Sequence, residues 1–173
     1  MNLDMVIRKV PDFPKPGIVF YDITSLFMYP EAMGFVAKKM LEAFETTKID
    51  AVISIESRGF IMGAIFAQEK KVPLILARKK GKLPCATYEE SYDLEYGQAT
   101  LEIHKADLAA GKKYLIIDDL IATGGTIKAV ATMVEKAGSE LAGIFSIIGL
   151  PFLGYAEKLK KYMLVVLHEY RGE

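Results

Sequence analysis

Short apolar runs recur along the chain, separated by turns or by segments with helical spacing. Uninterrupted apolar runs are typical of strands that are buried on both faces of a sheet. They predict strands at residues 51–55, 73–77, 114–117, 141–150 and 163–167. Residues 99–103 instead alternate apolar with polar side chains, which predicts a half-buried strand.

Helical periodicity appears between several of these runs. From Glu31 onward, apolar residues return at the spacing that places them on one face of a helix. These residues are Met33, Val36, Ala37, Met40, Leu41 and Phe44. Residues 60–71 and 126–136 predict two more helices. Near the start of the chain, residues 2–9 predict a short helix and residues 18–23 a short strand.

Apolar strands that alternate with helices predict an α/β fold: an open, mostly parallel, twisted sheet with helices on both faces. The length of 173 residues favours a single domain over residues 1–173. Residues 78–97 are polar, aromatic and glycine-containing, which predicts a long loop or a protruding hairpin. Ligands of such sheets bind beyond the carboxyl ends of the strands, a rule that points to residues 56–59 and 118–126.

The composition places no strong charge on the molecule as a whole. Lys plus Arg and Asp plus Glu each number 22, so the absence of net charge argues against a nucleic-acid or anionic-membrane partner. The single cysteine, Cys85, fits a reducing, cytoplasmic location. The N-terminal segment does not resemble a signal peptide, and no apolar run reaches the ~18 residues of a membrane span. Any anion site must therefore be local.

The segment YLIIDDLIATGGT, residues 114–126, joins two acids to a loop of small residues. Asp118 and Asp119 can accept hydrogen bonds from a vicinal diol, or face a cation. The loop after them opens a predicted helix, where free amides and the positive end of the helix dipole bind phosphate. Its residues are Ala122, Thr123, Gly124, Gly125 and Thr126. The letters TGGT alone would favour an ordinary tight turn, but the whole segment indicates a site for a phosphorylated sugar.

This segment resembles the phosphoribosyl-diphosphate (PRPP) motif of the type I phosphoribosyltransferase family. Four other segments resemble, in order and spacing, the signatures of its adenine-specific members. They are FPKPGIVFYDITSLF (13–27), ESRGF (56–60), RKKGKLP (78–84) and SYDLEYGQATLEI (91–103). The resemblance implies a pentosyltransferase of purine salvage that converts adenine and PRPP into AMP and diphosphate. It also implies Mg²⁺ bound mainly through PRPP, with no metal site made by the protein alone.

The resemblance assigns each anionic part of PRPP to a segment. Asp118 and Asp119 would hold the ribose hydroxyls, and the loop 122–126 the 5-phosphate. The residues implied to bind diphosphate are Glu56, Ser57, Arg58, Gly59, Arg78, Lys79 and Lys82. The family often has a non-proline cis peptide that would fall at Glu56–Ser57. Without the resemblance, Arg58 could equally be a surface ion-pair partner, and residues 78–82 a solvated loop.

The resemblance also implies where the base binds and what closes over it. Backbone groups of Val19, Phe20 and Tyr21 would read adenine, with Leu120 on its other face. Many members have a basic residue where this chain has Tyr21, so base affinity would differ if a side chain contributes. A flexible loop over about residues 79–97 would close over PRPP.

The residues implied to be catalytic are Arg58 and, in this loop, Glu95, which matches a proposed general acid or base. Tyr92 and Tyr96 would shield the reaction from water. Without the resemblance, Glu95 is an ordinary solvent-facing residue. The family's arginine that matches Arg78 reaches the partner's active site, which implies a functional homodimer.

Two alternatives remain open. One is a phosphoribosyltransferase for another purine, such as hypoxanthine or xanthine. The other is a non-catalytic, PRPP-sensing regulator on the same fold, although 173 residues leave no room for an additional nucleic-acid-binding domain.

Overall fold

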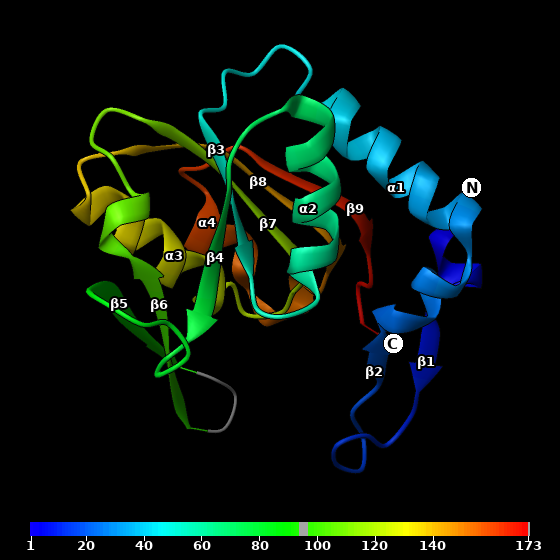
Figure 1. Ribbon diagram of the computed structural model, residues 1–173. Coiled ribbons are helices and arrows are strands. Elements are labelled where there is room, and N and C mark those ends of the chain that lie inside the picture. The colour runs from blue at the N-terminus through cyan, green and yellow to red at the C-terminus, as the bar shows by residue number, and fades with distance from the viewer. Residues whose placement is uncertain (94–96, 173) are drawn as a thin grey trace.

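Residues 1–93 and 97–172, which the computed structural model describes, contain a seven-stranded sheet (Figure 1). The strands are β3 (Ala51–Ile55), β4 (Leu74–Lys79), β5 (Thr87–Asp93), β6 (Gln98–His104), β7 (Lys113–Ile121), β8 (Glu140–Gly149) and β9 (Leu164–Glu169). Their order is β5-β6-β4-β3-β7-β8-β9. β4, β3, β7, β8 and β9 are parallel, whereas β6 pairs antiparallel with both β4 and β5. The predicted mostly parallel sheet is therefore confirmed.

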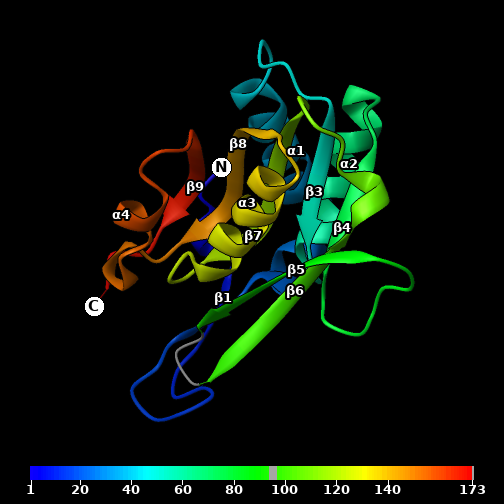
Figure 2. The same cartoon turned by 90° about the vertical axis from the view of Figure 1, so that its left-hand side faces the viewer.

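Helices cover both faces of this sheet, as predicted (Figures 1 and 2). The helices are α1 (Pro30–Ala43), α2 (Gly59–Lys70), α3 (Gly125–Lys136) and α4 (Tyr155–Leu159), with 3₁₀ turns η1 (Leu3–Met5), η2 (Ile23–Met28), η3 (Lys105–Asp107) and η4 (Pro151–Leu153). Alternate strand residues point to opposite faces, so the sheet has two apolar cores. Val52 and Leu115 pack with α1 and α2, whereas Ile53 and Ile116 pack with α3 and α4. No helix in the described residues is long and apolar enough to cross a membrane.

A separate two-stranded antiparallel sheet, β1 (Arg8–Val10) and β2 (Phe20–Asp22), lies near the N-terminus. The strand predicted at residues 18–23 is confirmed as β2. The helix predicted over residues 2–9 is wrong, because only Leu3–Met5 form a helical turn before β1. In Figure 1, this small sheet and the β5–β6 hairpin both extend beyond the carboxyl ends of the parallel strands.

Two element boundaries bear directly on the predicted site. β7 continues past its predicted end to Ile121, so Asp118 and Asp119 lie within the strand rather than in a loop after it. Within residues 78–97, for which a loop or a hairpin was predicted, residues 80–86 form turns and bends after β4, and residues 87–93 form β5, which pairs with β6 as a hairpin; residues 94–96 lie outside the described part of the chain. The loop 122–126, predicted to bind phosphate, thus follows directly on the end of a buried strand, which limits how far it can move.

α2 approaches the sheet closely at two glycines. A Cβ atom at Gly63 would lie 1.6 Å from Oγ of Ser54, and one at Gly59 would lie 2.9 Å from the carbonyl oxygen of Ile117. Any side chain at these positions would push α2 away from β3 and β7. Because residues 56–59 lead into α2, this contact also fixes their position against β7.

We expect Gly63→Ala to lower the free energy of unfolding by about 1–3 kcal/mol, the usual cost of overpacking a core. Denaturant unfolding measures the change. Gly34→Ala is the matched control: Gly34 is an exposed residue of α1, and a Cβ there would meet nothing within 4 Å. It should raise the free energy of unfolding by up to about 1 kcal/mol through helix propensity. Equal effects of the two substitutions would contradict the close approach of α2.

Candidate active site

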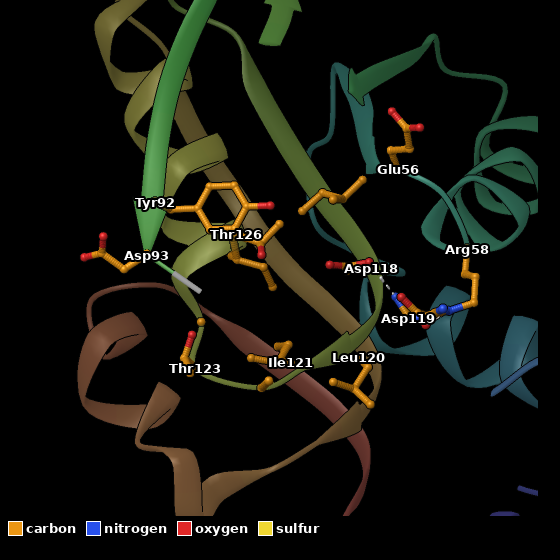
Figure 3. A pocket seen from close by; sticks show the side chains of 14 residues that line it. Glu56, Arg58, Tyr92, Asp93, Asp118, Asp119, Leu120, Ile121, Thr123 and Thr126 are labelled. Carbon is orange, nitrogen blue, oxygen red and sulfur yellow. Dashed lines mark hydrogen bonds and ion pairs between the residues drawn. The ribbon is translucent and has the colours of Figure 1, made fainter. Parts of the chain in front are cut away.

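A cavity of about 440 Å³ opens at the carboxyl ends of β3 and β7 (Figure 3). It brings together many of the predicted site residues: Glu56, Arg58, Asp118, Asp119, Leu120, Ala122, Thr123, Gly124 and Thr126. Tyr92 and Asp93, at the end of β5, line it as well. The two segments that the strand-end rule selected therefore do meet at one site, and the hairpin supplies a third wall.

The two acids are buried side by side. Asp118 is 7% exposed and Asp119 is 6% exposed. The backbone N–H of Asp119 donates to Oδ1 of Asp118 at 2.9 Å, and Nε of Arg58 donates to Oδ2 of Asp119 at 2.5 Å. Burial, followed by the neighbouring charge of Asp119, raises the pKa of Asp118 well above its usual range. The pair therefore favours a ligand that brings hydrogen-bond donors or positive charge.

Arg58 has a partner within the protein, as the ion-pair alternative anticipated. Burial opposes the charge of the guanidinium, but the carboxylate of Asp119 outweighs that effect and raises the pKa of Arg58. The bond to Asp119 uses only Nε, and a guanidinium has five N–H donors. Arg58 can therefore hold Asp119 and still present donors to an anion.

The small-residue loop closes onto the start of α3. Gly124 has φ of +75°, a conformation that glycine adopts without strain, and Oγ1 of Thr123 accepts the N–H of Gly125 at 3.4 Å. The first amides of an α-helix have no acceptor within the helix, and they carry its positive dipole end. Figure 3 shows Thr123 and Thr126 along this loop, beside the cavity. The loop therefore has the features of an anion-binding site: amides that have no acceptor within the helix, and close access to the backbone.

The predicted diphosphate segment and the basic stretch meet through Glu56. Its side chain is 8% exposed; Oε1 lies 2.5 Å from Nζ of Lys82, and Oε2 lies 3.4 Å from Nε of Arg78 and accepts the N–H of Lys79 at 2.9 Å. Burial alone would raise the pKa of Glu56, but these donors lower it. The Glu56–Ser57 peptide is cis, as the resemblance implied. Glu56 thus gathers the basic residues at the edge of the cavity.

Glu102 is a residue that the sequence reasoning missed. The alternation of residues 99–103 predicted that its side chain faces solvent, yet Glu102 is 3% exposed. Its Oε1 accepts the backbone N–H groups of Lys82 and Leu83 at 2.8 and 2.7 Å. The carboxylate therefore fixes the backbone of the basic stretch. Glu102 of β6 is the register partner of Arg78 in β4, and only the register of the two strands reveals this pairing.

The predicted adenine-binding residues divide into two groups. Leu120 lines the cavity, but Val19, Phe20 and Tyr21 are not among the described residues that line it. They lie on or next to β2, where the ring of Phe20 contacts Phe13 and the ring of Tyr21 turns to Tyr170. The side chain of Tyr21 is therefore engaged with a buried ring that follows the main sheet.

The end of β5 lies next to the loop 122–126. A Cβ atom at Gly125 would lie 3.2 Å from the carbonyl oxygen of Asp93 and 3.5 Å from the ring of Tyr92. Figure 3 shows the ring of Tyr92 beside Thr126 at the cavity. Tyr92 thus lies at the cavity, next to the start of α3. Glu95 and Tyr96 lie outside the described residues.

Comparison with known proteins finds relatives along the whole chain. Residues 24–171 match the family model described as phosphoribosyl transferase domain. The adenine phosphoribosyltransferase of Treponema denticola is 51% identical over 171 residues, which cover 99% of this chain and 90% of that protein. The crystal structure of the adenine phosphoribosyltransferase of Thermoanaerobacter pseudethanolicus matches with a TM-score of 0.92 at 41% identity, covering 96% of this chain and 97% of that one. The structure of the Saccharomyces cerevisiae adenine phosphoribosyltransferase matches with a TM-score of 0.89 at 34% identity, covering 96% of each chain. That enzyme is complexed with adenine and with D-2,5-dideoxy-2,5-imino-altritol 1,6-bisphosphate.

We expect Asp118→Asn to stabilise the substrate-free protein at pH 8 by about 1–2 kcal/mol, because it removes an unfavourable buried charge while Asn can still accept the N–H of Asp119. A carboxyl whose pKa is raised on folding loses stability as the pH rises from its unfolded pKa through its folded pKa. The gain should therefore vanish below about pH 4, near the ordinary pKa of Asp. Thermal or denaturant unfolding across this pH range measures it.

Asp119→Asn is the control for this prediction. It removes a neighbouring carboxylate of the same kind but also takes away the partner of Arg58, so no comparable gain should appear. A substrate-free Asp118→Asn protein that is less stable than the wild type at pH 8 would show that Asp118 carries a favourable charge.

Proposed function

The chain belongs to the phosphoribosyltransferase family, and we propose that it transfers the 5-phosphoribosyl group of PRPP to adenine, giving AMP and diphosphate. The observation that carries the proposal is one cavity in which a buried carboxylate pair lies next to an anion-binding helix start. PRPP presents the matching chemistry, a ribose diol beside a 5-phosphate. The similar proteins of Treponema denticola and Thermoanaerobacter pseudethanolicus are adenine phosphoribosyltransferases, which supports adenine as the base.

PRPP would bind through two adjacent segments of β7 and α3. The amides of the loop 122–126, with the hydroxyls of Thr123 and Thr126, would hold the 5-phosphate. Asp118 and Asp119 would accept hydrogen bonds from the ribose hydroxyls. These bonds would supply the donors that the buried carboxylates attract, so the sugar is fixed where its anomeric carbon can be attacked.

The diphosphate would lie between residues 56–59 and the basic stretch. The free N–H groups of Arg58, together with the amides of Ser57 and Gly59 at the start of α2, would bind the departing charge. Arg78, Lys79 and Lys82 would contribute from the other side. Because Glu56 already holds these groups at the cavity edge, little reorganisation is needed when the charge develops.

Mg²⁺ would arrive with PRPP. Within the described residues, no cluster of three or more acidic, histidine or cysteine side chains could hold a metal ion by itself. Two carboxylates plus substrate phosphate oxygens suit Mg²⁺, and the pair Asp118 and Asp119 fits that arrangement. When bound, the ion would neutralise part of the charge on the diphosphate.

Adenine would be placed between Leu120 and the backbone of residues 19–21. A backbone C=O and N–H match the exocyclic amine and a neighbouring ring nitrogen of adenine, whereas a 6-oxopurine leaves both unmatched. The side chain of Tyr21 stacks on Tyr170, which supports reading by the backbone. The substitution of tyrosine for the basic residue common in the family would then leave base selectivity intact.

Catalysis would rest on positioning, charge stabilisation and exclusion of water. Tyr92 would cover the oxocarbenium-like centre, which water would otherwise trap. Glu95 as a general acid or base on the purine is a further part of this proposal. We also propose that the protein works in the cytoplasm as a homodimer, in which Arg78 serves the partner's site, and that it binds neither nucleic acid nor membranes.

The proposed reaction is tested by supplying the protein with PRPP, Mg²⁺ and one base at a time: adenine, hypoxanthine, guanine, xanthine or uracil. We expect AMP and diphosphate from adenine, with kcat/KM about 10³-fold or more above that for any 6-oxopurine, because unmatched buried polar groups discriminate strongly. Turnover of hypoxanthine or xanthine in preference to adenine would contradict the proposed base. PRPP binding without turnover of any base would contradict the enzyme activity.

We expect Asp118→Asn and Asp119→Asn each to weaken PRPP binding by about tenfold or more, because each loses a charge-assisted hydrogen bond to ribose. The KM for adenine should change much less. Titration calorimetry with PRPP and steady-state kinetics measure the two effects. Asp107→Asn, at an exposed acid outside the cavity, is the control and should change neither. Unchanged PRPP affinity in both site variants would contradict the proposal that Asp118 and Asp119 bind the ribose hydroxyls.

A further inference from the structure

Tyr170 follows β9 and stacks on Tyr21 of β2. The ring centroids lie 3.8 Å apart and the ring planes meet at 17°, while Tyr170 is only 9% exposed. This contact joins the C-terminal end of the main sheet to the small N-terminal sheet. A residue outside the cavity thus touches the segment proposed to read adenine.

Several groups fix the ring of Tyr170. The ring of His168 packs edge-on against it at 4.6 Å, and Nζ of Lys9 lies 5.3 Å from its centroid. Asp4 holds that ammonium group at 2.8 Å. Lys9 is also the register partner of Tyr21. Both strands of the small sheet therefore contact the same buried ring.

The backbone of Tyr170 is tied to the wall of the cavity. Its N–H donates to the carbonyl oxygen of Gly149 at 3.0 Å, and Gly149 of β8 is the register partner of Ile121 in β7. The N–H of Leu150 donates to Ile121 at 2.9 Å, so the ends of β7 and β8 are held together. Leu120, which immediately precedes Ile121, lines the cavity. The backbone of Tyr170 is therefore connected to the strand ends next to Leu120, and its ring contacts Tyr21, in the segment proposed to read adenine.

Within β2, Tyr21 is the residue that faces the main sheet. Successive strand residues point to opposite sides, so the side chains of Phe20 and Asp22 leave in the other direction. Phe20 contacts Phe13, and Asp22 accepts a hydrogen bond from Arg8 at 3.0 Å. The stack on Tyr170 therefore helps to set the distance between β2 and the main sheet.

We propose that Tyr170 is a positioning residue for base binding: by stacking on Tyr21, it holds β2 at the distance from Leu120 that adenine requires. The proposal rests on the proposed function, because it takes the backbone of residues 19–21 as the segment that reads the base. Hydrogen bonds weaken steeply with distance and angle, so a small shift of β2 would weaken both contacts to adenine. PRPP would be unaffected, since its contacts come from β7, α2 and α3.

The test compares Tyr170→Leu with Tyr170→Phe in steady-state kinetics. We expect Tyr170→Leu to raise the KM for adenine about three- to tenfold, the usual strength of an aromatic pair, and to leave the KM for PRPP within about twofold. Tyr170→Phe keeps the ring and should behave nearly like the wild type. Tyr162→Leu is the matched control, because Tyr162 is a partly buried tyrosine packed against the other core; it should change neither KM.

A folded Tyr170→Leu protein with an unchanged KM for adenine would overturn the inference. So would an equal rise of both KM values that Tyr162→Leu reproduces, since general loosening of the fold would then explain the effect. If Tyr170→Leu does not fold, Tyr21→Leu breaks the same stack from its other ring and should give the same selective rise. A wild-type protein that does not turn over adenine would instead overturn the proposed function, and this inference with it.

Discussion

Two carboxylates are buried next to each other at the carboxyl end of β7, and the surrounding structure must keep them there. Removing paired or unpaired charges from water costs several kcal/mol unless donors compensate it. The backbone N–H of Asp119 serves Asp118, and Arg58 serves Asp119 across 61 positions of sequence. This ion pair joins the end of β7 to the start of α2. Residues 56–59 and the loop 122–126 are therefore joined through this ion pair as well as through the close packing of α2 against β7.

Charge in this protein is organised locally rather than globally. The chain has no net charge, yet the cavity brings together a buried acidic pair and Arg58, and Glu56 at its edge contacts the basic stretch 78–82. Two further acids hold that stretch. Glu56 contacts the side chains of Arg78 and Lys82, and the buried Glu102 accepts backbone N–H groups of Lys82 and Leu83. Each of these two acids accepts hydrogen bonds or ion pairs from the stretch, which keeps its cations close to the cavity. Such an arrangement suits a substrate that is itself a mixture of hydroxyls and phosphates.

The walls of the site come from elements of very different character. The floor belongs to the buried parallel strands and the starts of α2 and α3, where close packing restricts motion. The β5–β6 hairpin supplies a side wall through Tyr92 and Asp93. The small N-terminal sheet also reaches beyond the carboxyl ends of the strands (Figure 1), but none of its described residues lines the cavity. The small sheet is joined to the floor through aromatic contacts such as that of Tyr21 with Tyr170. The proposed ribose and phosphate sites thus lie on closely packed elements, whereas the hairpin and the small sheet project from them.

The sequence alone predicted those features that depend on residues close together in the chain. Apolar runs predicted the parallel strands, because a strand buried on both faces must be apolar throughout. The phosphate loop was recognisable because small residues, a strand end and a helix start adjoin in the chain. Other features were decided only by the tertiary structure. Leu3 and Ile7 have helical spacing, but packing with Ile23 and Leu26 places them around a short turn and a strand. Glu102 looked solvent-facing, but the backbone of Lys82 and Leu83 folds over it and buries it. The pairings of Arg58 with Asp119 and of Tyr21 with Tyr170 join residues far apart in the chain, and their partners are chosen by how whole elements pack rather than by any local spacing.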